Sequence, residues 1–95
     1  MQVTNEIPSS LIATRSKAIE LHASGCLASP TMPTATRIAQ SLFDEVVAAR
    51  NLIRKGVDCT STMDVIDEVA GLLHRNLGEQ VISRVAQLRR IAARN

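Results

Sequence analysis

The chain has 95 residues, of which 45% are hydrophobic and 21% are charged, and its formal net charge is +2. These are ordinary values for a globular protein, and the length leaves room for one domain. Phe43 is the only aromatic residue. The absence of Trp and Tyr excludes an aromatic stacking platform for single-stranded nucleic acid and an aromatic cage for cations. The net charge is too small to indicate nucleic-acid binding by itself.

The N-terminal part of the chain divides into an arm and a first helix. Residues 1–8 carry little periodicity, and we expect a flexible arm there, followed by a single helical domain over 9–95. Apolar residues then recur at helical spacing, which predicts a helix over 9–24. Ser9 or Ser10 is expected to cap its free amide groups, because serine is favoured at that position.

A second helix is predicted after a linker that contains two prolines. Gly25 supplies the positive φ that commonly follows a helix, and the prolines within 25–34 oppose a continuing helix. Thr34 is expected to cap a helix over 35–55, whose apolar residues recur three and four positions apart. Gly56 is expected to end that helix.

The C-terminal part of the chain shows two further helical patterns. Helices are predicted over 62–77 and 79–93, with Gly78 as the break between them. The apolar residues stay in phase across Gly78, so one kinked helix over 62–93 is the alternative. No segment alternates apolar and polar residues with a period of two, so no strand is expected. The predicted fold class is all-α, a small bundle of three to four helices in which short connections favour antiparallel neighbours.

The charged residues of the last two predicted helices differ in sign. Asp64, Asp67 and Glu68 lie near the start of 62–77, whereas 79–93 is rich in arginine. An acidic start is common in helices, because it complements the helix dipole. A sharper hypothesis is that this acidic segment meets a basic end of another helix, within the chain or in a second chain.

The cysteines and histidines indicate a reduced, metal-free protein. Cys26 and Cys59 flank the predicted second helix, which would separate them by roughly 33 Å. A disulfide needs Cα atoms within about 7 Å, so we expect two reduced thiols and a cytoplasmic protein. A disulfide between the two copies of a dimer is the alternative. No stretch approaches the roughly 18 apolar residues of a membrane span, so no membrane partner is expected. No two of these cysteines and His22 and His74 have zinc-finger spacing, so no metal and no other cofactor is predicted.

The sequence does not indicate an enzyme. It contains no glycine-rich phosphate loop, no GxSxG nucleophile elbow and no HExxH metal motif. The neighbouring carboxylates at the start of 62–77 fit an ordinary acidic helix turn. No convergent set of catalytic residues is therefore predicted.

The arginine-rich C-terminal helix gives an alternative function, that of a dimeric DNA-binding transcriptional regulator. Arginine binds phosphates and guanine edges, and four arginines lie within eleven residues. Gly78 would provide the turn between the two helices of a helix-turn-helix unit. A solvated outer face is the simpler explanation of the arginines, and we favour it. The nucleic-acid-binding residues in this alternative are Arg84, Arg89, Arg90 and Arg94.

Contact with proteins is the favoured function. The aliphatic stripes suit helix–helix packing, and paired apolar residues widen the faces of the second and third helices beyond one seam. A small chain has few helices to cover such faces, so a second copy or another protein is expected to do so. The alternative is a monomer in which the four helices cover one another. We therefore predict a homodimer that acts as a regulator, adaptor or inhibitor of a larger assembly. The predicted contact residues are Leu42, Val46, Ile53, Val69, Leu72 and Leu73.

Overall fold

The computed structural model describes residues 6–94, which form four α-helices and no strand. The prediction of an all-helical fold is confirmed, and the first two helices agree with the predicted ranges 9–24 and 35–55 to within two residues. The helices are α1 (Ser9–Ala23), α2 (Pro33–Arg54), α3 (Thr60–Ala70) and α4 (Arg75–Arg94).

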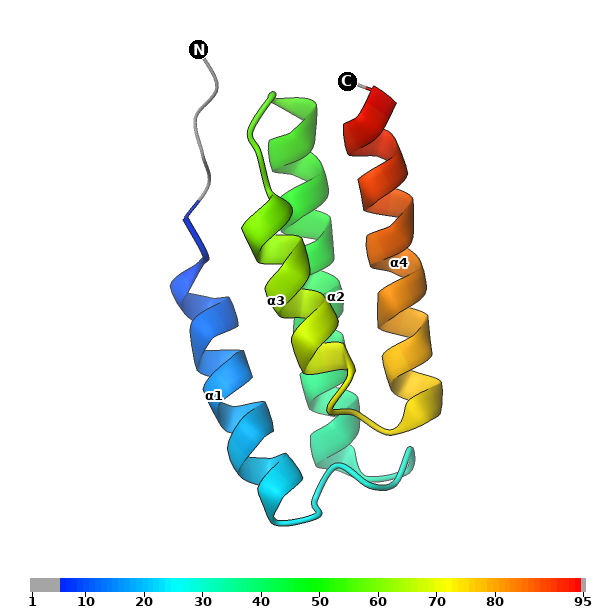
Figure 1. The fold of residues 1–95 in the computed structure, drawn as a ribbon. Coiled ribbons are helices and arrows are strands. Elements are labelled where there is room, and N and C mark those ends of the chain that lie inside the picture. Colours follow the sequence, from blue (N-terminus) through cyan, green and yellow to red (C-terminus); the bar gives the residue numbers. More distant parts are fainter. Residues whose placement is uncertain (1–5, 95) are drawn as a thin grey trace.

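The helices alternate in direction along the chain, so α1 and α3 run one way and α2 and α4 the other (Figure 1). α2 and α3 each pack against all three other helices, whereas α1 and α4 make no contact with each other in the described chain. The two central helices are therefore flanked by α1 on one side and by α4 on the other. The bundle is flattened, with Cα extents of 43 × 22 × 15 Å, so its helices keep broad outer faces.

The core is built from the apolar stripes of the four helices. Leu42 of α2, Ile66 of α3 and Val85 of α4 are at most 1% exposed. α2 buries seven residues along its length, because it is covered on several sides. α1 buries only Leu11 and Ala18, so most of its other side chains remain on the surface.

Two glycines end α1 and α2, as the sequence predicts. Gly25 and Gly56 have φ angles of 78° and 84°, a region that glycine adopts without a steric penalty. After α1, the amide of Gly25 donates to His22 O at 3.0 Å and the amide of Cys26 donates to Leu21 O at 2.9 Å. This pair of bonds is the Schellman arrangement, which satisfies carbonyls that the end of a helix leaves free.

The capping residues predicted for the starts of the first two helices are wrong. Ser9 and Ser10 lie inside α1, directly after Pro8, and neither serine caps it. Thr34 lies in the first turn of α2 after Pro33, and no side chain caps that helix either. Proline suits the beginning of a helix, because its φ is already helical and its missing N–H would have no partner there. The prolines therefore set these starts one or two residues earlier than side-chain capping would.

The predicted boundary at Gly78 between 62–77 and 79–93 is wrong, and so is the alternative of one kinked helix over 62–93. The turn follows Ala70, and Gly78 lies buried in the first turns of α4. A Cβ atom at Gly78 would stand 2.4 Å from Ala70 O. The glycine is therefore a close contact between α3 and α4 and does not interrupt a helix.

Two further expectations are a flexible N-terminal arm and the absence of a membrane-spanning helix. Of the predicted arm over 1–8, residues 1–5 lie outside the described part, and 6–8 precede α1 without helical structure. None of the helices in residues 6–94 combines the length and the apolar character that crossing a membrane requires.

Candidate interaction surfaces

Most of the predicted partner-contact residues lie inside the folded chain. Leu72 is partly exposed, but the other five residues are at most 8% exposed. They are covered by the chain itself, because α2 and α3 are the two central helices. A partner that docks on the folded chain would not reach them, so partner contact through them stays a prediction. The five buried residues are Leu42, Val46, Ile53, Val69 and Leu73.

An ion pair joins α1 to α3 on the outside of the bundle. The Nε and Nη2 atoms of Arg15 donate to the two carboxylate oxygens of Glu68 at 3.0 and 2.9 Å. The two side chains are 42% and 48% exposed. The hydrogen bonds from Arg15 hold the pKa of Glu68 below its ordinary value. The pair therefore bridges α1 and α3 across their outer surface.

Aliphatic side chains lie on both sides of this ion pair. Ile12 and Ile19 lie three residues before and four residues after Arg15, so all three share one side of α1. These isoleucines are 51% and 42% exposed. Val65 lies three residues before Glu68 on α3, and Leu72 lies four residues after it, in the turn that follows α3. Both side chains are partly buried.

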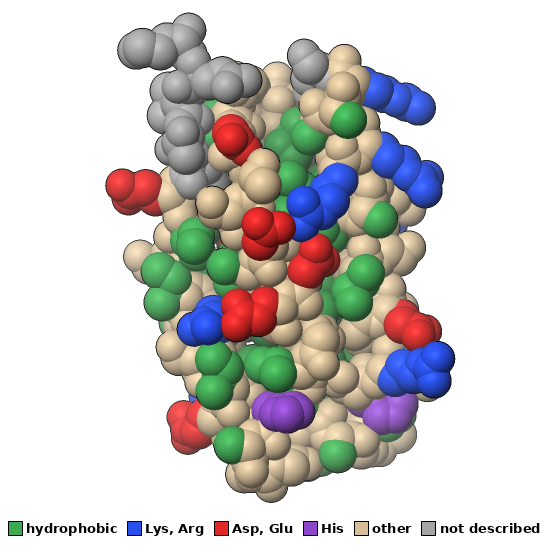
Figure 2. Space-filling view, in the orientation of Figure 1, with side chains coloured by type: hydrophobic (Ala, Val, Ile, Leu, Met, Phe, Trp, Pro, Cys, Tyr) green, Lys and Arg blue, Asp and Glu red, His purple; other side chains and the backbone are tan. Residues whose placement is uncertain are grey.

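Because α1 and α3 run in the same direction, the equal spacing puts Ile12 about level with Val65. Leu72 lies beyond the end of α3, in a hollow that it lines together with His22 and Gly25 at the end of α1. Figure 2 shows hydrophobic side chains around adjoining basic and acidic side chains on this side of the molecule. We call this surface the α1–α3 face. It consists of Ile12, Arg15, Ile19, Val65, Glu68 and Leu72.

A groove runs between α2 and α4. Its floor is apolar and includes Phe43, and its most exposed aliphatic residue is Val47, at 58%. Arg50 of α2 and Arg84 of α4 line it from opposite walls, and no carboxylate among residues 6–94 lines it. We call this surface the α2–α4 groove. It is lined by Gln40, Phe43, Val46, Val47 and Arg50 of α2, and by Gln80, Arg84, Gln87, Leu88 and Ile91 of α4.

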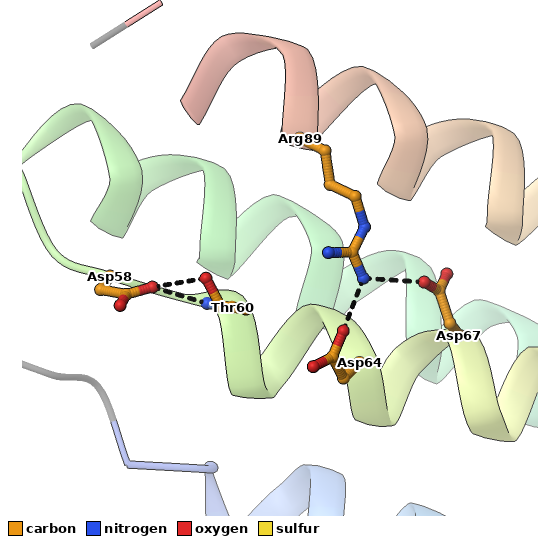
Figure 3. A network of polar contacts seen from close by, with 5 residues as sticks. All are labelled: Asp58, Thr60, Asp64, Asp67 and Arg89. Carbon is orange, nitrogen blue, oxygen red and sulfur yellow. Dashed lines mark hydrogen bonds and ion pairs between the residues drawn. The ribbon is translucent and has the colours of Figure 1, made fainter. Parts of the chain in front are cut away.

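Arg89 of α4 is engaged with the acidic residues of α3 (Figure 3). Its Nη2 donates to Asp64 at 2.8 Å and to Asp67 at 2.9 Å. The hydrogen bond with Asp64, followed by the one with Asp67, raises the pKa of Arg89. The other oxygen of Asp67 is buried and accepts no hydrogen bond in the described structure. The hypothesis that the acidic segment meets a basic helix is therefore confirmed within one chain.

The four C-terminal arginines do not form one patch. Arg84 and Arg89 are five positions apart, about 140° around the helix, and they lie on the α2 side and the α3 side of α4. Arg90 and Arg94 are exposed on the remaining surface of α4. The predicted helix-turn-helix break at Gly78 is also absent, because Gly78 lies within α4. DNA binding through these arginines stays a prediction.

In the part of the chain that the structure describes, no three histidine, cysteine, aspartate or glutamate side chains lie close enough together to hold a metal ion. His74 instead lies just before α4. Its Nδ1 accepts a hydrogen bond of 3.2 Å from the amide of Asn76, which satisfies a free donor at the start of the helix.

Sequence reasoning missed both outer surfaces. The spacing of Ile12 and Ile19 was a usable signal, because residues seven apart share a helix face that differs from the face of Leu11 and Ala18. The Arg15–Glu68 contact spans 53 residues of sequence, and no local pattern indicates it. No local pattern indicates the α2–α4 groove either, because its two walls come from distant segments of the sequence.

No protein-family model matches the chain, and neither a curated protein nor a solved structure matches it. The function is therefore inferred from the surfaces of the chain itself.

Proposed function

We propose that this chain is a non-enzymatic helical protein-interaction module that works as a homodimer, joined through the α1–α3 face. The observation that carries the proposal is the self-complementary arrangement of that face. It places a positive charge on α1 beside exposed isoleucines, and a negative charge on α3 beside partly buried aliphatic side chains. A two-fold dimer interface uses the same patch on both copies, so the patch must complement itself.

A two-fold axis parallel to the helices meets this condition. It places α1 of one copy opposite α3 of the other and preserves the height of each residue. Arg15 then faces Glu68 of the second copy, and Ile12 faces Val65 of the second copy. Each of these charges meets its opposite, and each of these aliphatic side chains meets another aliphatic side chain.

Burial of the exposed isoleucines supplies the main driving force for association. Complete burial of a large aliphatic side chain is worth about 1.5–3 kcal/mol, and Ile12 and Ile19 each have about half of their surface still to bury. The dimer also adds apolar burial to a small chain, which by itself buries a modest fraction of its surface. The charged residues determine how the two copies align more than they increase affinity, because ion pairs in water contribute little binding free energy.

The module acts by contact, as a regulator, adaptor or inhibitor. Several of its charged side chains are used to join helices to one another, as Arg89 is with Asp67. We place the protein in the cytoplasm, because Cys26 and Cys59 form no disulfide and lie before and after α2. A DNA-binding regulator has less support, since one of its four predicted arginines is held by α3.

Sedimentation equilibrium tests the proposal. The wild-type protein should sediment with twice the 10.3 kDa mass of the chain. Ile19→Glu should sediment as a monomer, because the glutamate would put an extra charge into the apolar part of the interface. Val47→Glu makes a similar change at an exposed position outside the α1–α3 face, and it should leave the mass at that of the dimer. A monomeric wild type, or an Ile19→Glu variant that stays dimeric, would refute the proposal.

A charge-swap experiment tests the geometry of the dimer. The double variant Arg15→Glu with Glu68→Arg should pair with itself, because opposite charges still face each other. It should not mix with the wild type, since arginine would then face arginine and glutamate would face glutamate. Native mass spectrometry of a mixture with a tagged wild type measures this directly. Free mixing of the two proteins would place the interface elsewhere.

A further inference from the structure

The α2–α4 groove is a second surface that the proposed dimer leaves open. It lies between α2 and α4, whereas the dimer contact lies on α1 and α3, and α1 and α4 do not touch in the described chain. We propose that the groove binds an amphipathic helical segment of another protein, with an apolar stripe and carboxylates at both edges. This inference builds on the proposed role as an interaction module and names its partner's chemistry, but it does not require the two copies to be joined.

The floor of the groove provides the apolar part of the site. Val46 and Leu88 are buried beneath it, Phe43 and Ile91 are partly exposed, and Val47 is 58% exposed. These side chains come from two helices that run in the same direction, so the floor is a strip along the helix axes. A helix that lies along such a strip covers it with residues spaced three and four apart.

The walls of the groove provide the charge that selects the partner. Arg50 and Arg84 line opposite walls, and neither makes an ion pair within residues 6–94. The adjoining hollow contains one carboxylate, that of Glu79, which is paired with Arg75 at 3.1 Å. The groove is therefore positive on both sides, and carboxylates at the two edges of a bound helix would complement it.

The two arginines are staggered along the groove. Phe43 and Arg84 both line the groove and also the adjoining hollow, so they lie at the same part of it. Arg50 lies seven residues after Phe43 on α2, which is about 10 Å further along the helix. A matching segment carries one carboxylate at one edge and another at the opposite edge, about two turns away.

Other occupants fit the groove less well. Two copies joined groove to groove would bring Arg50 and Arg84 of one copy close to the same arginines of the other. A DNA backbone would meet the arginines, but it would leave the apolar floor facing phosphates and water. An amphipathic helix is the occupant that satisfies both the floor and the walls.

Peptide binding tests the inference. The probe is a labelled helical peptide with a leucine stripe and glutamates at both edges, and matched peptides carry glutamine or lysine at the edge positions. At low salt, each arginine should favour glutamate over glutamine by about 2- to 5-fold, as expected for an exposed ion pair. The double variant Arg50→Glu with Arg84→Glu should prefer the lysine peptide. The variant Arg90→Glu makes the same charge change at an exposed position outside the groove and should keep the preference for glutamate.

Each result of the titration has a distinct meaning. Equal affinity for the three peptides would overturn the acidic partner. No binding of any peptide, together with DNA duplex binding that Arg50→Glu and Arg84→Glu abolish, would overturn it in favour of nucleic acid. A monomeric protein that binds the glutamate peptide would support this inference and refute only the dimer, and a dimer that binds no peptide would refute only this inference.

Discussion

Gly78 of α4 lies directly against the carbonyl oxygen of Ala70 in α3, since a Cβ atom built on Gly78 would stand 2.4 Å from that oxygen. The glycine is helical, so its role is the close approach of two backbones and not an unusual φ angle. The amide of Gly78 donates to His74 O at 2.8 Å and so joins the turn to the helix. This contact sets how α4 leaves α3, and thus the position of Arg84 in the groove and of Arg89 beside Asp67.

Gly78→Ala should therefore destabilise the fold. Alanine gains about 1 kcal/mol in helix propensity over glycine. Forced overpacking costs typically about 1–3 kcal/mol, and the cost should be high here because the obstacle is backbone. We expect a net loss of stability in urea denaturation followed by circular dichroism. Gly71→Ala is the matched control, since its Cβ would meet Glu68 O at an ordinary 3.4 Å. Equal stability of the two variants would contradict the contact.

Arg89→Gln should weaken the packing of α4 on α3. The pair with Asp67 is partly exposed, at 40% and 36%, so we expect a coupling energy of about 0.5–1 kcal/mol. A double-mutant cycle with Asp67→Asn measures it, and the coupling should fall as salt is added. Arg90→Gln changes the neighbouring exposed arginine and should have no measurable effect. A coupling energy of zero would mean that the network in Figure 3 does not stabilise the fold.

The turn before α3 should make stability depend on pH. Oδ1 of Asp58 accepts hydrogen bonds from Thr60 Oγ1 at 2.7 Å and from Thr60 N at 2.9 Å, and these bonds lower the pKa of Asp58. Its contribution is thus complete above the unfolded pKa of about 3.9 and is lost as the pH falls through the lower, folded pKa.

Urea denaturation from about pH 7 to about pH 2 checks this prediction. Asp58→Asn should be less stable than the wild type at neutral pH, and the difference should vanish in acid. Thr60→Val removes the hydroxyl, the largest cause of the lowered pKa, and should reduce the pH dependence by itself. A difference between wild type and Asp58→Asn that stays constant over the whole range would show that Asp58 does not titrate in this way.

Leu42→Ala should destabilise the single chain, because Leu42 is fully buried in its core. Truncation of a buried leucine costs about 2–5 kcal/mol. Val47→Ala removes a side chain that is 58% exposed, and it should change stability by less than about 0.5 kcal/mol. Denaturation and the native mass together distinguish a core role of Leu42 from a role in the dimer interface. A Leu42→Ala variant of unchanged stability that loses dimer mass would make Leu42 an interface residue, as the sequence alone predicts.

Local patterns determined the parts of this protein that depend on one segment at a time. The stripes that contain Leu42 and Val85 predicted helices, because a side chain returns to the same face every three or four residues. Gly25 and Gly56 predicted helix ends, because a positive φ is a property of one residue. The starts were less accurate, since Pro33 competes with the neighbouring Thr34 for the same position.

Only the tertiary structure decided what covers each face. The stripe of Leu42 shows that one side of α2 is apolar, but it cannot tell whether another helix or another chain buries it. The role of Gly78 depends on the carbonyl of Ala70, and the role of Arg89 depends on Asp64 and Asp67. These contacts arise from the distances and angles between packed helices, and for that reason a period along a single helix carries no information about them.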